Sequence, residues 1–245
     1  MPSKLCSKPH HHIAAPPLVM RGVIVPIVPS VSTLSYLPGF PNLMKFSRPS
    51  RLSPPLKALG PDGLHALVFQ SNWYSLGPSI IQVIQEIFEH LTIPPSWGVT
   101  NLVLISKVAH PNVITQFCPI SLCNTLYNLL SRIIVLRLKP FMEEVINPCQ
   151  AGFVSGRRTS DNIIIVQEVI WTLISQRGRM GYVALKLDLE KAYDRLEWSF
   201  IQETLEYFQV PSSLITLIMN MISSTRFHIL WNGSPLPEVV PGRGI

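Results

Sequence analysis

The sequence has few cysteines, no long apolar run and no acidic residue near its start. Four cysteines occur in 245 residues, and their spacing fits neither a zinc site nor a secreted disulfide framework. Reduced thiols are therefore expected, which favours an intracellular protein. The apolar share is 47% and the mean hydropathy is +0.30. No apolar run approaches the roughly 20 residues of a membrane-spanning helix, so we predict no membrane partner.

Acidic residues are absent from residues 1–56, which hold six basic residues and 11 of the 23 prolines. The other 14 of the 20 basic residues face all 14 acidic ones, so the net charge of +6 belongs to this leader. A nucleic-acid partner would therefore need a local basic groove. The leader has no sustained periodicity, and we predict that it is disordered. Its acid-free composition is typical of organelle transit peptides, but the leader lacks their amphipathic face. Nuclear, cytoplasmic and organellar locations therefore stay open.

Order is predicted to begin near residue 57, where Gly60-Pro-Asp-Gly63 favours a turn. Apolar spacing predicts helices over residues 78–91 (with Pro78 in the first turn), 121–139 (ended by Pro140), 161–176, 198–208 and 211–223. Strands are predicted over residues 100–106, 183–188 and 225–231, the last followed by a tight Asn232-Gly233 hairpin turn. This mixture, without strict alternation of strand and helix, predicts an α+β fold.

The central stretch is residues 183–194, VALKLDLEKAYD. Its predicted strand ends on the carboxylate of Asp188, and Tyr193 follows five residues later. A strand holds a carboxylate rigidly, and its end leaves the oxygens open to a hard cation such as Mg²⁺. From the residues alone, the alternative is that Asp188 caps the next helix.

Five stretches, taken in order, resemble one family: KALGPDG (57–63), FCPISLCNTLYN (117–128), QAGFVSGRRTSDNI (150–163), LKLDLEKAYDRLEW (185–198) and ILWNGSPLPEVVPGRGI (229–245). From Lys57 to Ile245 the chain is similar to the reverse transcriptase of plant LINE-type (non-LTR) retrotransposons. The resemblance implies a right-hand polymerase fold and DNA synthesis on an RNA template. Residues 57–180 would be a helical fingers-like region with a short strand, and residues 181–245 a partial palm; the resemblance does not extend to the leader, residues 1–56.

The resemblance also implies a metal and nucleotide site. Two Mg²⁺ ions would lie in the intact family site, with Asp188 as the first carboxylate ligand and the carbonyl of Leu189 helping to hold the second ion. Tyr193 matches the aromatic residue under the sugar, where a ring excludes a 2′-hydroxyl and selects deoxynucleoside triphosphates. Lys107 matches the lysine that reaches the triphosphate. The alternatives are a core role for Tyr193 and a solvated Lys107.

Two arginines carry the implied contact with nucleic acid. Arg157 and Arg158 stand in a Gly-flanked loop, which suits phosphate contacts along an RNA template or a DNA primer. The alternative is a pair of exposed loop arginines without a ligand.

The sequence departs from the family pattern at two important places. Cys118 stands where the family has an arginine that contacts the triphosphate, and cysteine lacks its charge and its fork of donors. No Asp-Asp pair occurs, and the last acidic residue is Glu238, so one carboxylate would have to hold two ions. We therefore predict a reverse transcriptase fragment that is inactive alone and exposes apolar palm surface. The alternatives are an active enzyme, if the chain belongs to a longer polyprotein, and a non-catalytic nucleic-acid-binding module.

Overall fold

The computed structural model describes residues 18–20, 23–25, 54–154, 156–175 and 185–245. These residues belong to two compact units. One unit contains Leu138–Asp188 together with strands β1 (Leu18–Met20) and β2 (Val23–Val25). The other contains residues 54–137 and Leu189–Ile245, and it includes the sheet.

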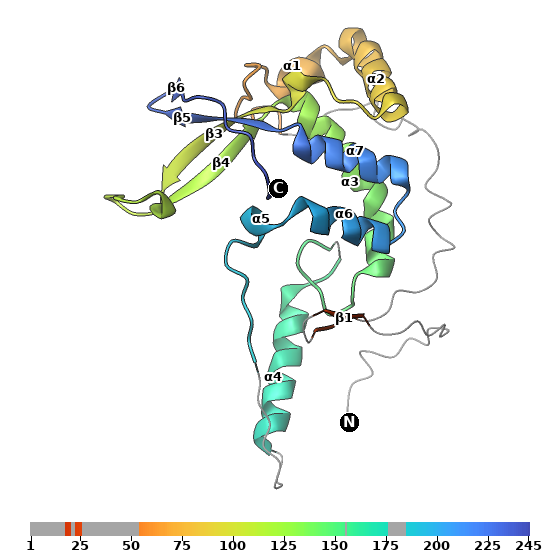
Figure 1. Cartoon of the computed structure of the whole chain (residues 1–245), viewed down its shortest axis with the longest axis vertical. Coiled ribbons are helices and arrows are strands. Elements are labelled where there is room, and N and C mark those ends of the chain that lie inside the picture. Colours follow the sequence, from red (N-terminus) through yellow and green to blue (C-terminus); the bar gives the residue numbers. More distant parts are fainter. Residues whose placement is uncertain (1–17, 21–22, 26–53, 155, 176–184) are drawn as a thin grey trace. The chain divides into compact units, whose positions relative to one another are not determined.

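A mixed four-stranded sheet forms the β-layer of the second unit (Figure 1). Its strands are β3 (Val99–Ser106), β4 (Phe117–Cys123), β5 (Arg226–Trp231) and β6 (Ser234–Pro235), in the order β4-β3-β5-β6. β3 pairs antiparallel with β4 and parallel with β5, and β5 pairs antiparallel with β6. The α+β prediction and the strands at 100–106 and 225–231 are confirmed.

The hairpin predicted at Asn232-Gly233 is also confirmed. Asn232 has φ 49° and Gly233 has φ 81°. Two successive positive φ angles are what a two-residue type I′ turn requires, and this turn matches the right-handed twist of the strands that it joins.

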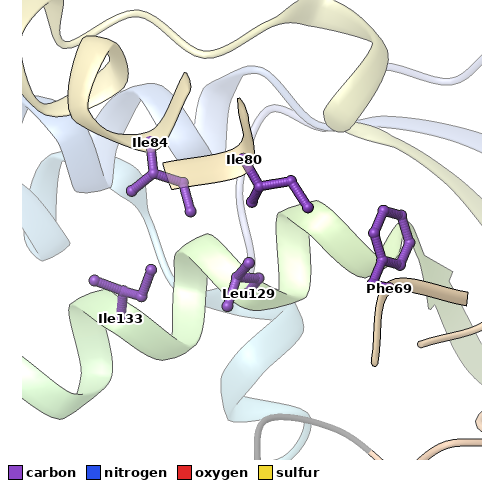
Figure 2. Close-up of a cluster of buried hydrophobic side chains, with 5 residues drawn as sticks. All are labelled: Phe69, Ile80, Ile84, Leu129 and Ile133. Carbon is purple, nitrogen blue, oxygen red and sulfur yellow. The ribbon is translucent and has the colours of Figure 1, made fainter. Parts of the chain in front are cut away.

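Helices α1 (Ala66–Ser71), α2 (Trp73–His90) and α3 (Thr125–Val145) supply the apolar core of the second unit. Five buried side chains from these helices form one cluster (Figure 2): Phe69, Ile80, Ile84, Leu129 and Ile133. Ile84 and Ile133 are 2% and 1% exposed. Truncating either of them to alanine would cost about 2–5 kcal/mol, so this contact between α2 and α3 is a major part of the fold's stability.

Two helix boundaries that were predicted from proline are wrong. α2 begins at Trp73, so Pro78 lies inside it, and α3 continues past Pro140 to Val145. Both prolines are exposed, so water can solvate the carbonyl groups that they leave without a partner. The apolar face of α2 is buried beyond its proline, at Ile80 and Ile84, and that packing outweighs the lost hydrogen bond.

The predicted start of the third helix, at residue 121, is also wrong. Residues 117–123 form strand β4, with Ser121 opposite Leu102 in β3, and the helix begins only at Thr125. Pairing with a strand some 20 residues earlier overrides the local helical spacing of the apolar residues.

Helices α6 (Trp198–Tyr207) and α7 (Ser212–Ser223) confirm two further predictions and pack against each other. α7 buries Leu214, Ile215, Leu217 and Met221. The phenol of Tyr127 in α3 donates to the carbonyl oxygen of Met221 at 3.1 Å and also lies 3.3 Å from the hydroxyl of Thr225. Burial raises the pKa of this phenol.

Helix α4 (Thr159–Ser175) of the first unit has no buried residue. Its exposed apolar side chains are Ile163, Ile164, Ile165, Val166, Val169, Ile170, Trp171 and Ile174. Leu185 and Leu187 are 78% and 77% exposed. The exposure of Leu185 and Leu187 agrees with the predicted apolar surface of the palm, whereas α4 lies in the region predicted to be fingers-like. β1 and β2 pair antiparallel within the leader, and its other residues up to 53 lie outside the described ranges.

Candidate nucleotide and nucleic-acid site

The β3–β4 hairpin brings Lys107 and Cys118 together. Ile105 lies opposite Cys118 in the ladder, and the backbone N–H of Lys107 donates to the carbonyl oxygen of Gln116 at 2.8 Å, which extends the pairing by one step. Residues two apart on a strand share a face, so Lys107 and Cys118 are diagonal neighbours on one face. Such neighbours have Cβ atoms roughly 7–8 Å apart. Both residues are exposed.

This geometry makes the replacement at Cys118 informative. Lys107, directly after the end of β3, offers a cation on this face, and the thiol of Cys118 beside it adds neither charge nor a strong donor. An arginine at position 118 would place a second cation next to Lys107. The hairpin therefore carries one cation at the two positions where the family pattern has a lysine and an arginine.

The Asp188 segment differs from its prediction. The described part of the predicted strand, residues 185–188, lies outside any strand, and Asp188 is exposed. No described strand pairs with residues 185–188, and the side chains of Leu185 and Leu187 are 78% and 77% exposed. The rigid strand end inferred from the sequence is therefore wrong for residues 185–188.

Tyr193 lies in a short helix that follows at once. Lys191 adopts the left-handed conformation with φ 51°, and α5 (Ala192–Arg195) begins after it. An exposed ion pair joins Glu190 to Arg195 at 3.3 Å. Tyr193 is 53% exposed, so it is not a buried core aromatic.

The last residues of the chain brace this turn. The backbone N–H of Gly244 donates to the carbonyl oxygen of Leu196 at 2.8 Å, and that of Ile245 donates to Tyr193 at 3.3 Å. The indole N–H of Trp198 donates to the carbonyl oxygen of Gly244 at 2.8 Å. Gly244 has φ 84°, and a Cβ there would come within 3.2 Å of two carbonyl oxygens of α5, so glycine is required for this approach.

Arg157 acts as a clamp within its own loop. Its guanidinium donates to three backbone carbonyl oxygens, those of Ile146, Asn147 and Gln150, at 2.5–3.1 Å. Ile146 directly follows the end of α3, where a cation also complements the helix dipole. Arg158 is exposed. Of the two arginines, Arg157 is thus engaged in holding the loop, and Arg158 faces solvent.

Asn124 joins the turn at residues 60–63 to the residues that precede β3, a structural role that the sequence analysis did not predict. It is 5% exposed. Its Oδ1 accepts from the backbone N–H of Asp62 at 3.1 Å, and its Nδ2 donates to the carbonyl oxygen of Ser96 at 2.9 Å. A Cβ on Gly60 would come within 2.8 Å of the Asn124 backbone. The only sequence signal was the position of Asn124 within the FCPISLCNTLYN stretch.

The donors around Asp188 do not fit a two-metal centre. The part of the chain that the structure describes contains no group of three or more His, Cys, Asp or Glu side chains that could hold a metal ion. One carboxylate and the adjacent carbonyl of Leu189 suit at most a single Mg²⁺ that keeps water and nucleotide phosphates as its other ligands. Among the same described residues, no helix is long and apolar enough to cross a membrane.

Comparison with known proteins decides the family. The profile described as "Reverse transcriptase (RNA-dependent DNA polymerase)" matches residues 107–240, more than half of the chain. The chain belongs to the reverse transcriptase family. This reverse transcriptase domain is 31% identical over 204 residues to the "Transposon TX1 uncharacterized 149 kDa protein" of Xenopus laevis, covering 83% of this chain and 15% of that protein.

Two further relatives are polyproteins of R2 retrotransposable elements. The domain is 28% identical over 153 residues to the "Retrovirus-related Pol polyprotein from type-2 retrotransposable element R2DM" of Drosophila melanogaster, and 26% identical over 156 residues to that of the type-1 element R2 of Popillia japonica. Each alignment covers 62% of this chain, but only 14% and 21% of the respective polyprotein. The homologues are therefore non-LTR retrotransposon proteins, and the reverse transcriptase domain described here spans a minor part of their length.

Proposed function

We propose that this chain is the fingers and the first half of the palm of an RNA-directed DNA polymerase from a plant LINE-type retrotransposon. Residues 57–180 would form the fingers-like region and residues 181–245 the partial palm, with residues 1–56 as a Pro-rich basic leader. The match of residues 107–240 to the reverse transcriptase family carries this proposal. The support for a plant lineage is the residues of the five sequence stretches.

The nucleotide would be bound from two sides. Lys107, directly after the end of β3, would neutralise charge on the triphosphate. Tyr193, half exposed on its braced turn, would lie against the sugar and exclude a 2′-hydroxyl. The exposed position of Lys107 and the fixed backbone of Tyr193 support these two roles.

Nucleic acid would be bound by the loop that Arg157 holds. Arg158 would contact a phosphate of the RNA template or the DNA primer, and Arg157 would position the loop and share its remaining donors. The support is the exposure of Arg158 beside the three carbonyl contacts of Arg157.

The 245 residues alone would not polymerise DNA. Reverse transcriptases use Mg²⁺ and act on an RNA template with a DNA primer, and Asp188 with the carbonyl of Leu189 would supply part of a metal site. The sequence contains no Asp-Asp pair to complete the site. What the chain keeps, on this proposal, is the binding of nucleic acid and nucleotide.

The test combines primer extension with equilibrium binding on the same preparation. A poly(rA) template with an oligo(dT) primer, Mg²⁺ and dTTP should give no extension above an Asp188→Ala control. The same primer–template should bind with an affinity that falls as salt rises, because bound phosphates release counterions. Extension that depends on Asp188 would refute the proposal that the 245 residues alone do not polymerise DNA. No binding at low salt would refute the polymerase assignment of this chain.

A second candidate is an active enzyme in which these residues are one part. The observation that favours it is that the relatives are much longer than this chain, which spans 14–21% of the three proteins compared. Reading the coding sequence across codon 245 separates the two. An in-frame continuation into an Asp-Asp hairpin would support the active enzyme, and a stop codon would contradict it.

A further inference from the structure

The loop before α4 presents Phe153 in an unusual way. Its side chain is 95% exposed. Its φ is +63°, in the left-handed region that bulky residues rarely adopt. An exposed aromatic ring and a left-handed backbone each cost free energy. A residue keeps both only where the surrounding structure imposes them. Strained residues of this kind cluster at ligand-binding positions.

The surroundings of Phe153 impose this conformation. The next residue, Val154, is 9% exposed, so its burial anchors the backbone directly after Phe153. The backbone N–H of Arg157 donates to the carbonyl oxygen of Val154 at 3.4 Å, and the Arg157 side chain ties the loop to the carbonyl oxygens of residues 146, 147 and 150. These contacts tie the backbone on the C-terminal side of Phe153 to residues 146–150, while the Phe153 side chain is 95% exposed.

The residues near Phe153 in the sequence indicate which class of ligand the loop would bind. Arg158 is exposed five residues further on, and the loop holds no acidic residue from position 145 to position 160. An exposed aromatic ring with a cation further along the same loop is a combination by which proteins bind unpaired nucleotides, since every base offers a π-face and every linkage a phosphate.

We propose that Phe153 stacks on an unpaired nucleobase of a single strand while Arg158 contacts a neighbouring phosphate. Phe153 is thereby assigned as a nucleic-acid-binding residue of the braced loop. This inference rests on the proposed function, because it requires a nucleic-acid partner. Double-stranded nucleic acid would not engage the ring, since its bases are already stacked within the helix.

The experiment uses the full chain and two 12-nucleotide single strands, one RNA and one DNA, each with a central 2-aminopurine whose fluorescence falls on stacking. Phe153→Gly and Phe153→Leu should weaken the binding of the single strand roughly 5- to 150-fold and abolish the quenching. Phe153→Trp should keep both. A blunt 12-base-pair RNA duplex should bind the wild type and all three variants equally.

The variants separate binding from folding. Glycine adopts φ +63° freely, so Phe153→Gly should unfold at the same or a higher temperature than the wild type while it binds less well. Phe153→Leu keeps apolar bulk without a π-face, so retained binding by this variant would indicate a merely hydrophobic contact and overturn the proposal. Tyr74→Leu is the matched control, because Tyr74 is 98% exposed on α2 and should have no effect.

The outcomes also separate this inference from the proposed function. If the wild type binds the single strands and Phe153→Gly binds them equally well, the stacking role is wrong and the polymerase proposal stands. If the wild type binds no nucleic acid at low salt, both are wrong. The RNA and DNA arms show which strand the ring accepts, and quenching in either one supports the proposal.

Discussion

Replacing Asn124 tests whether one buried amide holds the base of the β3–β4 hairpin. Asn124→Ala removes the acceptor of the Asp62 N–H and the donor to the Ser96 carbonyl oxygen. A typical hydrogen bond contributes about 0.5–1.5 kcal/mol, and a buried group left without a partner costs about 1–3 kcal/mol. With Asn124 5% exposed, the two losses together predict a destabilisation of about 2–4 kcal/mol.

The choice of substitution sharpens the test. Asn124→Asp keeps an oxygen for the Asp62 N–H but turns an oxygen toward the Ser96 carbonyl in place of the donor. Aspartate should therefore be no better than alanine, although it is closest to asparagine in shape. Gly60→Ala should destabilise through the same contact by about 1–3 kcal/mol, because its Cβ would come within 2.8 Å of the Asn124 backbone.

The assay is urea unfolding followed by far-UV circular dichroism. Asn72→Ala is the matched control, since Asn72 is exposed and its amide makes one local bond, to the carbonyl oxygen of Val68. It should cost less than about 1 kcal/mol. If Asn124→Ala and Asn72→Ala cost the same, or if Asn124→Asp matches the wild type, the role of Asn124 in linking the turn at residues 60–63 to α3 is wrong.

Three further predictions concern the remaining described contacts. Tyr127→Phe should cost about 0.5–1.5 kcal/mol at pH 8. Because burial raises the pKa of this phenol in the folded state, its contribution to stability is full below about pH 10 and is lost as the pH rises through the pKa of the folded state. Urea melts between those two pH values should therefore show the variant losing less stability than the wild type. Cys118→Arg should strengthen the binding of tripolyphosphate several-fold by calorimetry without lowering stability, and Lys107→Ala should cancel the gain if the two share a face. Arg157→Lys should lower both the melting temperature and RNA affinity, because a lysine cannot clamp three carbonyl groups, whereas Arg158→Gln should lower only the affinity and its salt slope.

Local sequence patterns predicted the elements whose signals are local. The Asn232-Gly233 hairpin, α6 and α7 follow from turn chemistry and from a clear 3.6-residue period, and the structure confirms them. The α+β fold class followed from the mixture of predicted strands and helices, and the family assignment from the order of five sequence stretches. These inferences did not depend on any contact between distant parts of the chain.

The misses have a common physical origin. β4 was missed because its apolar residues also fit a helical period, and only pairing with β3 selects the strand. Pro78 and Pro140 were taken as boundaries because the local penalty of proline is visible in the sequence, while the burial that outweighs it is not. The strand predicted to end at Asp188 was wrong for the opposite reason. The local pattern favours a strand, but no described strand pairs with residues 185–188.

At the candidate site, the sequence indicated which residues to consider but not the contacts that those residues make. Lys107 and Tyr193 were chosen by resemblance, and their exposure agrees with contact to a ligand. The clamp made by Arg157, the amide of Asn124 and the outward ring of Phe153 could not be predicted, because each depends on backbone groups brought close by folding. The assigned roles of Asp188, Leu189, Lys107, Tyr193, Arg157 and Arg158 stay predictions.

The most direct test of the central claim is nucleotide discrimination by the full chain. Radiolabelled dTTP and UTP would be crosslinked by ultraviolet light in the presence of Mg²⁺ and an RNA template with a recessed DNA primer. The account predicts that dTTP labels the chain more strongly than UTP, that Lys107→Ala loses both signals, and that Tyr193→Ala raises UTP labelling to the level of dTTP. Equal labelling of the wild type by the two nucleotides, or labelling that ignores both substitutions, would contradict it.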